Sequence, residues 1–426
     1  MANQEFNSGL VGGLFMEYKH RALEELVKQT KDTFKCVLVT GARQTGKSTM
    51  LKELFRELPY VTLDDDFIKD QAEANPRFFI SMNKPPVIID EIQKAPALFP
   101  LVKIECDNTD KKGLFLLSGS QPLAIMKNAS ESLAGRVGIL ELSTLSLREI
   151  SGDSFNRPFI PTTDYLAERK STAKKPENIW NIIHRGMYPE IQDENINWNT
   201  FYSSYISTYL EKDVRALTAV QNLSDFRKFM IAAAARTGEM LNISNIADEI
   251  GKDAKTVKNW LSILEASGIV YILEPFANSV LKRAIKTPKL YFRDTGLAAY
   301  LTRWLTPEQL ANGAMSGQFF ETFVVSEILK SYSNAGIDYR YCVSYYRGKD
   351  KINGTEGEID LIIEENGVVY PIEIKKNESV NAGMTAAFRV LDNLPDKKRG
   401  TGAVICSCPD VGIVRDNIFS VPVYYI

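Results

Sequence analysis

The stretch Gly41-Ala42-Arg43-Gln44-Thr45-Gly46-Lys47-Ser48-Thr49 decides the fold that the sequence predicts. It matches the pattern G-x-x-x-x-G-K-[ST] in full, and it lies between an apolar run at residues 36–40 and a helical pattern at residues 48–58. A glycine-rich turn between a strand and a helix presents backbone N–H groups and the positive end of the helix dipole to phosphates. Lys47 adds a positive charge for the phosphates, and Ser48 adds a hydroxyl ligand for Mg²⁺. We therefore expect residues 41–49 to bind ATP together with Mg²⁺.

A second signal is the run Val87-Ile88-Ile89-Asp90-Glu91, in which a buried strand ends in two acids. Parallel α/β sheets bind their ligands at the carboxyl ends of the strands, where these acids are expected to lie. Asp90 is predicted to hold the Mg²⁺ shell, as a Walker B acid does. Glu91 is predicted to polarise the attacking water as a catalytic base, and the alternative is a surface carboxylate.

Other polar residues are candidates for contact with the γ-phosphate. The apolar run at residues 114–118 ends in a polar segment, so that Ser118 or Ser120 is a candidate sensor; a polar strand end without a catalytic role is the alternative. Arg136 is a candidate arginine finger, in cis or from a neighbouring subunit, and Arg43 is a second cation near phosphate. For each arginine, a solvated or ion-paired side chain is the alternative. A finger in trans requires oligomers, and the sequence leaves this question open.

Short apolar runs alternate with helical patterns from residue 36 to about residue 143, which predicts a parallel α/β sheet with helices on its faces. The expected strands are residues 36–40, 60–63, 86–90, 114–118 and 139–142.

Composition excludes several classes of protein. The 426 residues are 44% hydrophobic and 24% charged, which is typical of globular proteins with two or three domains. A net charge of −2 gives no general support for nucleic-acid binding. The five cysteines fit neither zinc nor redox spacing, so free thiols in a reducing cytosol are expected. No secretory signal and no apolar stretch near the length of about 18 residues that a membrane span needs is present, so we expect a cytoplasmic protein without membrane attachment.

The region after residue 223 predicts a winged helix-turn-helix. A helix at residues 243–250, a polar turn, a helix at 254–267 and a strand at 269–273 follow one another. Lys255, Lys258 and Asn259 share one face of the second helix, opposite an apolar face. A wing would add the basic residues Lys282, Arg283, Lys286 and Lys289, which makes double-stranded DNA a candidate partner. The alternative is a winged helix that packs against the ATPase core or a protein partner.

The C-terminal part predicts a separate mixed α/β unit, which follows a linker at residues 306–317 and an amphipathic helix at 318–331. Glu373 and Lys375 lie two apart on one predicted strand and therefore share a face, where Asp360 of the preceding strand is expected to join them. Carboxylates can hold Mg²⁺ and a lysine can position water, which is what phosphodiester hydrolysis requires. The alternatives are an inactive binding module or an exposed hairpin with ion-paired charges.

This spacing resembles PD-(D/E)xK nucleases, in which Asp360, Glu373 and Lys375 would match the motif. Glu321, on the preceding helix, would match the helical acid that many members of that fold add. The resemblance implies a metal site at these acids, with Lys375 beside it rather than as a ligand.

The sequence as a whole resembles AAA+ superfamily ATPases of bacteria and archaea whose C-terminal region is an uncharacterised nuclease-like domain. The resemblance lies in residues 40–49, 63–65, 89–96, 118–120, 133–136, 186–190 and 292–297. It implies an α/β protein with a P-loop parallel sheet, a helical and winged-helix region and a small mixed α/β domain. The expected boundaries are 1–150 for the ATPase domain, 151–222 for a linker and helical region, 223–305 for the winged helix and 306–426 for the nuclease-like domain.

Two functions remain open from the sequence. In the first, an Mg²⁺-dependent ATPase controls how the winged helix and the nuclease-like domain engage DNA. In the second, the chain is an ATP-dependent regulatory or signalling switch, in which an inactive nuclease-like domain recognises a protein partner.

Overall fold

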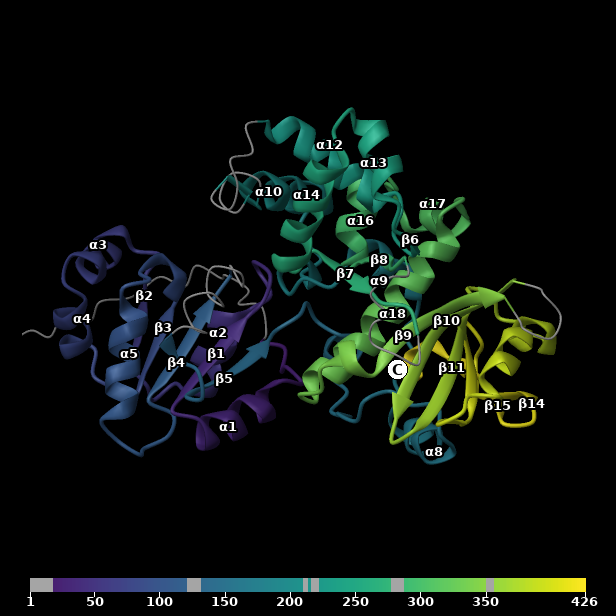
Figure 1. The fold of residues 1–426 in the computed structure, drawn as a ribbon, viewed down its shortest axis with the longest axis horizontal. Coiled ribbons are helices and arrows are strands. Elements are labelled where there is room, and N and C mark those ends of the chain that lie inside the picture. Colours follow the sequence, from purple (N-terminus) through teal and green to yellow (C-terminus); the bar gives the residue numbers. More distant parts are fainter. Residues whose placement is uncertain (1–17, 121–131, 210–213, 216–221, 277–286, 350–355) are drawn as a thin grey trace, which may run out of the picture.

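The computed structural model describes residues 18–120, 132–209, 214–215, 222–276, 287–349 and 356–426. Figure 1 shows an N-terminal sheet with its helices, a middle group of helices, and a C-terminal sheet. We call these the N-terminal part (residues 18–145), the middle part (146–315) and the C-terminal part (316–426). None of the helices in the described ranges combines the length and the apolar character that a membrane span needs.

The N-terminal part contains a parallel sheet of five strands in the order β2-β3-β4-β1-β5. The strands are β1 (Cys36–Thr40), β2 (Tyr60–Thr62), β3 (Val87–Asp90), β4 (Phe115–Gly119) and β5 (Val137–Glu141). The helices are α1 (Glu24–Thr33), α2 (Lys47–Leu54), α3 (Asp66–Ala74), α4 (Pro76–Met82) and α5 (Leu98–Asp107). The predicted α/β class with a P-loop-type parallel sheet is confirmed, and β4 lies between β1 and β3.

Both faces of the central strands are covered, which explains why β1, β3 and β4 are buried and largely apolar. Along β1, Cys36 and Leu38 pack with α3, α4 and α5 on one face. Val37 and Val39 pack with α1 and α2 on the other face. This buried sheet fixes the carboxyl ends of β1, β3 and β4 at one edge, where the residues of the predicted ATP site begin (Figure 1).

The middle part consists of helices and one small antiparallel sheet. Its helices are α7 (Leu147–Ser151), α8 (Thr163–Thr172), α9 (Ile179–Arg185), α10 (Trp198–Tyr209), α12 (Leu223–Ala234), α13 (Ile243–Ile250), α14 (Ala254–Ala266), α16 (Thr295–Leu301) and α17 (Pro307–Asn312). The sheet has the order β6-β8-β7 and is formed by β6 (Glu239–Met240), β7 (Val270–Leu273) and β8 (Lys289–Phe292). The expected linker at residues 306–317 instead contains α17, because Thr306 caps this helix and Pro307 starts it.

The C-terminal part begins with the long helix α18 (Ser316–Asn334), which is followed by a mixed sheet. The strands are β9 (Val343–Lys349), β10 (Glu356–Glu365), β11 (Val368–Ile374), β12 (Lys398–Arg399), β13 (Gly402–Cys406), β14 (Gly412–Arg415) and β15 (Ile418–Pro422), in the order β14-β15-β13-β11-β10-β9 with β12 beside β11.

The three parts also contain 3-10 helices. These are η1 (Ile92–Lys94) in the N-terminal part, η2 (Glu190–Gln192) in the middle part, and η4 (Tyr339–Tyr341), η5 (Ala382–Leu391) and η6 (Val423–Tyr425) in the C-terminal part.

Helix α18 is buried on nearly all sides, whereas the sequence predicted an amphipathic helix. Phe320 packs towards Trp180 of the middle part, and Phe319 and Val324 are also fully buried. One hydrophobic cluster joins the middle helices, α18 and the strands β11 and β13. The helix has no solvent-facing polar stripe because it lies between these two layers, so the middle and C-terminal parts share a core.

Candidate functional site

The loop between β1 and α2 has the backbone that its glycines predict. Gly41 has φ +144°, and a Cβ atom there would lie 2.2 Å from the carbonyl oxygen of Leu142, so only glycine fits. Gly46 has φ +91° and precedes the first turn of α2. The loop is closed by a hydrogen bond from the Thr45 hydroxyl to the Ala42 carbonyl oxygen (3.0 Å).

Lys47 points along this loop into a pocket. Its side chain is buried, and Nζ donates to the carbonyl oxygens of Gly41 (3.1 Å) and Ala42 (2.7 Å). These carbonyls fix the ammonium group at the start of α2, where the helix dipole also favours an anion.

Three hydroxyl groups hold the carboxylate of Asp90. Ser48 Oγ donates to Oδ1 (2.7 Å), and Ser118 Oγ donates to the same atom. Tyr60, at the start of β2, donates to Oδ2 (2.8 Å). The pair of Ser48 and Asp90 places a hydroxyl and a carboxylate oxygen side by side, which are the hard ligands that Mg²⁺ prefers.

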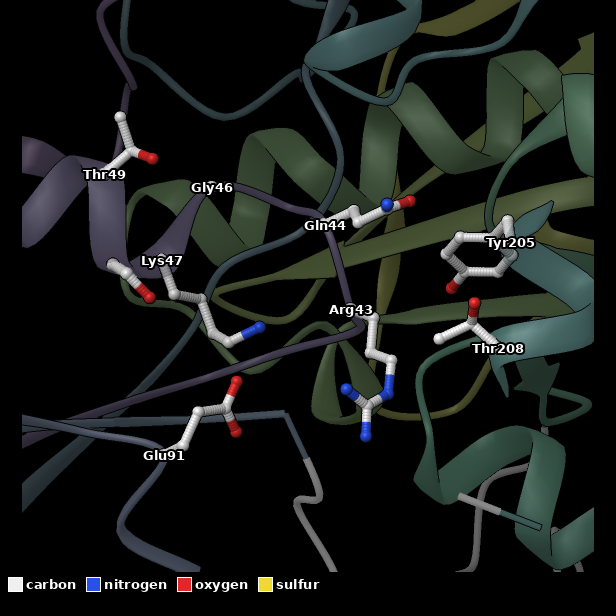
Figure 2. Close-up of a pocket in the computed structure, with 9 residues that line it drawn as sticks. Arg43, Gln44, Gly46, Lys47, Thr49, Glu91, Tyr205 and Thr208 are labelled. Carbon is white, nitrogen blue, oxygen red and sulfur yellow. The ribbon is translucent and has the colours of Figure 1, made fainter. Parts of the chain in front are cut away.

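Glu91 directly follows β3 and turns its side chain towards Lys47, as Figure 2 shows. Its φ of +55° is unfavourable for a residue with a Cβ atom, and such strain is common at functional sites. Oε2 accepts hydrogen bonds from Ser120 Oγ (3.0 Å) and from the Ser120 N–H (3.3 Å), and it also contacts Gln93 Nε2. Ser120 and Gln93 thus orient the carboxylate of Glu91.

The pocket that these groups share has a volume of about 300 Å³. Its lining residues are Arg43, Gln44, Gly46, Lys47, Ser48, Thr49, Glu91, Tyr205 and Thr208. The last two belong to α10 of the middle part, and the sequence analysis missed them (Figure 2).

Two predicted catalytic residues, Ser118 and Arg136, do not line this pocket in the described structure. Ser118 is fully buried, and its hydroxyl contacts Asp90 rather than the pocket surface. Arg136 is bound by both carboxylate oxygens of Asp107 and by the carbonyl oxygen of Ala134, and it does not line the pocket. Ser118 is therefore placed to position Asp90. Its role as a sensor, and a role of Arg136 as a finger, stay predictions.

Residues 33–151 match the protein family described as "AAA domain". This segment is an AAA-type P-loop ATPase domain. It contains β1 to β5 and every group of the pocket except those on α10, which supports ATP as the ligand. Residues 176–308 and 316–425 match two families that are described as domains of unknown function (DUF8612 and DUF4143).

The chain is also similar to two uncharacterized proteins, from Mycobacterium tuberculosis and Mycobacterium bovis. Each is 27% identical over 359 residues, which cover 83% of this chain and 73% of the relative. Among solved structures, a Walker-type ATPase of Pyrococcus abyssi has a TM-score of 0.41 at 13% identity and covers 66% of this chain and 94% of its own. The AMPPCP-bound DnaA of Aquifex aeolicus has a TM-score of 0.28 at 14% identity, with 57% and 85% covered.

Outside the AAA domain, the structure brings together Asp360, Glu373 and Lys375. Lys375 Nζ lies 2.6 Å from Glu373 Oε1 and 3.7 Å from Asp360 Oδ2. Burial and then the charge of Asp360 raise the pKa of Glu373 to about 8. Glu373 Oε2 is buried without a hydrogen-bond partner among the described residues.

Glu321 has other partners. It accepts hydrogen bonds from Lys289 Nζ (3.0 Å) and the Tyr291 hydroxyl (2.6 Å), and Lys289 Nζ also lies 2.7 Å from Glu358. Burial and then the charge of Asp360 raise the pKa of Glu321 to about 7. Within the described ranges, no group of three acids, histidines or cysteines is arranged to hold a metal ion.

The basic strip expected for a wing is corrected in one respect. Lys289 is 3% exposed and paired with acids, so it does not face solvent as a phosphate contact. Its position on β8 turns it towards α18. Lys282, Arg283 and Lys286 lie outside the described residues. On α14, Lys255, Lys258 and Asn259 are exposed as expected.

Proposed function

We propose that this chain hydrolyses ATP with Mg²⁺ in the pocket between the loop at residues 41–46 and α10. The observation that carries the proposal is the 2.7 Å hydrogen bond between Ser48 and Asp90, beside Lys47 and Glu91. A hydroxyl, a carboxylate, an ammonium group and a second carboxylate are the groups that phosphoryl transfer to water requires.

Each residue has a distinct role in this proposal. Ser48 and Asp90 would hold Mg²⁺, which would neutralise charge on the phosphates. Lys47 binds the β and γ phosphates, and Glu91 orients the attacking water and accepts its proton. Ser118 and Tyr60 keep the Asp90 carboxylate in place, while Ser120 and Gln93 do the same for Glu91.

The test is phosphate release by the full chain with Mg²⁺ and ATP, comparing Glu91→Gln with the wild type. Turnover should fall about 100-fold or more because the amide cannot accept the proton, while binding of a fluorescent ATP analogue should persist. Glu73→Gln, an exposed acid on α3, serves as the matched control and should leave turnover unchanged. Equal turnover in the wild type and Glu91→Gln would remove Glu91 from this role.

Tyr60→Phe tests how Asp90 is positioned. The change removes one hydroxyl from the Asp90 carboxylate without altering the ring, so the Mg²⁺ concentration for half-maximal turnover should rise about tenfold. Tyr341→Phe is the control, since Tyr341 is 81% exposed. A Mg²⁺ titration of turnover that superimposes on the wild type would exclude a positioning role for Tyr60.

Metal-dependent cleavage of DNA by the C-terminal part is a second candidate function. Asp360 and Glu373 would hold a divalent cation, and the buried, unpartnered Oε2 of Glu373 fits a metal ligand. Lys375 lies beside both acids, where it can position water. The position of Glu321 argues against DNA cleavage, because its carboxylate is already bound by Lys289. This contact favours the alternative, a C-terminal part that recognises a protein partner under control of the nucleotide.

Supercoiled plasmid separates these two possibilities. If the C-terminal part cleaves DNA, the wild type should nick the plasmid with Mg²⁺ or Mn²⁺. Asp360→Asn should reduce the rate of nicking at least tenfold, whereas Asp392→Asn, a change on the protein surface, serves as the control. Absence of nicking, together with ATP turnover that double-stranded DNA does not alter, would leave the regulatory switch as the supported function.

A further inference from the structure

One wall of the nucleotide pocket comes from outside the AAA domain. Tyr205 and Thr208 lie three residues apart on α10, so their side chains share one face of the helix. Figure 2 shows both hydroxyl groups on the side of the pocket where Arg43 lies, while Thr49 lies on the far side of Lys47. The family match at residues 33–151 does not include this helix.

Buried hydrogen bonds fix α10 in this position. The Tyr188 hydroxyl donates to the Tyr205 hydroxyl (2.8 Å), and the rings of these residues pack with centroids 4.9 Å apart. One turn earlier, the Tyr202 hydroxyl donates to Asp294 Oδ1 (2.8 Å). Asp294 also accepts from the Met187 N–H (2.6 Å). These contacts hold the helix against the loop at residues 186–188, and they fix Tyr205, which itself lines the pocket next to Thr208.

Thr208 differs from Tyr205 because its side chain is exposed to the pocket and to solvent. Within the described ranges, the Thr208 hydroxyl has no hydrogen-bond partner. A hydroxyl can both donate and accept, so it can bind a phosphate oxygen without breaking an existing contact.

The charges opposite Thr208 indicate which part of a nucleotide it would meet. Lys47 reaches the β and γ phosphates in loops of this type, whereas the residues after it lie nearer the α phosphate. Thr208 lies beyond Arg43, on the side of Lys47 away from Thr49 (Figure 2). Glu91, which orients the attacking water in the proposed mechanism, faces Lys47 from the same pocket.

We infer that Thr208 binds the terminal phosphate of ATP and thereby makes the pocket discriminate ATP from ADP. This inference rests on the proposed ATP function. In this inference the middle part contributes a contact to the nucleotide, and Tyr205 positions Thr208 for that contact. A nucleotide with a γ-phosphate then joins the AAA domain to α10, whereas ADP does not reach this helix.

The experiment measures the affinity of the full chain for a fluorescent non-hydrolysable ATP analogue and for the matching ADP compound, both with Mg²⁺. Thr208→Val removes the hydroxyl and keeps the shape. It should weaken binding of the ATP analogue about tenfold, the effect of one hydrogen bond to a charged group, and change ADP binding less than twofold. Thr208→Ser should restore the affinity. Ser207→Ala, the same kind of deletion at an exposed neighbour on α10, should change neither.

Equal weakening for both nucleotides, or none for either, would overturn the inference while leaving the proposed ATP function intact. A wild-type chain that binds neither nucleotide would overturn both. Because Thr208 is exposed, the valine variant is expected to fold as the wild type does, and matching thermal unfolding curves without nucleotide would verify this point.

Discussion

Replacing Lys47 with alanine is expected to reduce ATP turnover about 100- to 1000-fold and to abolish measurable binding of ATP at micromolar concentrations. The ammonium group is buried and oriented by the carbonyl oxygens of Gly41 and Ala42, so it does not have to be ordered when a phosphate arrives. Loss of one such preorganised donor at a site sheltered from water removes about 3 to 4 kcal/mol of stabilisation from the transition state.

Lys28→Ala provides the control for this change. Lys28 is half exposed on α1, and its contact with Glu25 spans 3.9 Å, so its removal should leave turnover within twofold. The measurements are phosphate release and equilibrium binding of a fluorescent nucleotide by the same preparations. Retention of more than a third of the wild-type turnover in Lys47→Ala would show that ATP is hydrolysed at another site of the chain or by another protein in the preparation.

The residues around Lys47 can be predicted from the sequence because their chemistry is local. The glycines of residues 41–49 determine the backbone conformation of the loop. Asp90 ends a strand whose burial is evident from its apolar composition, and Glu91 follows it. The fold then brings these segments together at one sheet edge by a general property of parallel sheets. Alternation along a strand likewise predicted that Glu373 and Lys375 share a face, and both the Asp360 and Glu373 carboxylates lie within 4 Å of the Lys375 ammonium group.

The wall formed by α10 could not be predicted in this way. Tyr205 and Thr208 are distant in sequence from the loop, and no local pattern distinguishes them from the other polar and aromatic residues of the helix. Their position depends on tertiary contacts, such as the pair of Tyr188 and Tyr205. For the same reason the sequence could not show that α18 lies between two layers of the core.

Lys289 was misplaced for a different reason. It ends a basic segment that is typical of a wing, and this pattern outweighed the alternation of Lys289 and Tyr291 on one strand face. That alternation was the available signal, because Lys289 and Tyr291 lie on one face of a four-residue strand that is buried throughout, and a buried ammonium group needs an acidic partner. The structure supplies such partners from α18 and β10.

Lys289→Met is accordingly expected to lower the free energy of unfolding of the full chain by about 3 to 5 kcal/mol. Burial opposes the charge of Lys289, but the carboxylates around it outweigh burial and raise its pKa. Methionine keeps much of the side-chain volume but leaves Glu321 and Glu358 without this cation. A buried carboxylate that loses its counterion costs far more than a surface pair does.

The measurement is urea unfolding followed by circular dichroism, with Lys228→Met as the control. Lys228 is 62% exposed and pairs with Asp225 across 3.3 Å, so its loss should cost less than about 1 kcal/mol. Adding Glu321→Gln to Lys289→Met should recover a large share of the lost stability, because the second change removes the uncompensated charge. If the double variant were as unstable as Lys289→Met, packing of the lysine stem rather than its charge would account for the loss. Recovery of stability in the double variant would establish that Lys289 is the cation that neutralises Glu321. A metal ion would then have to displace Lys289 before Glu321 could become a ligand.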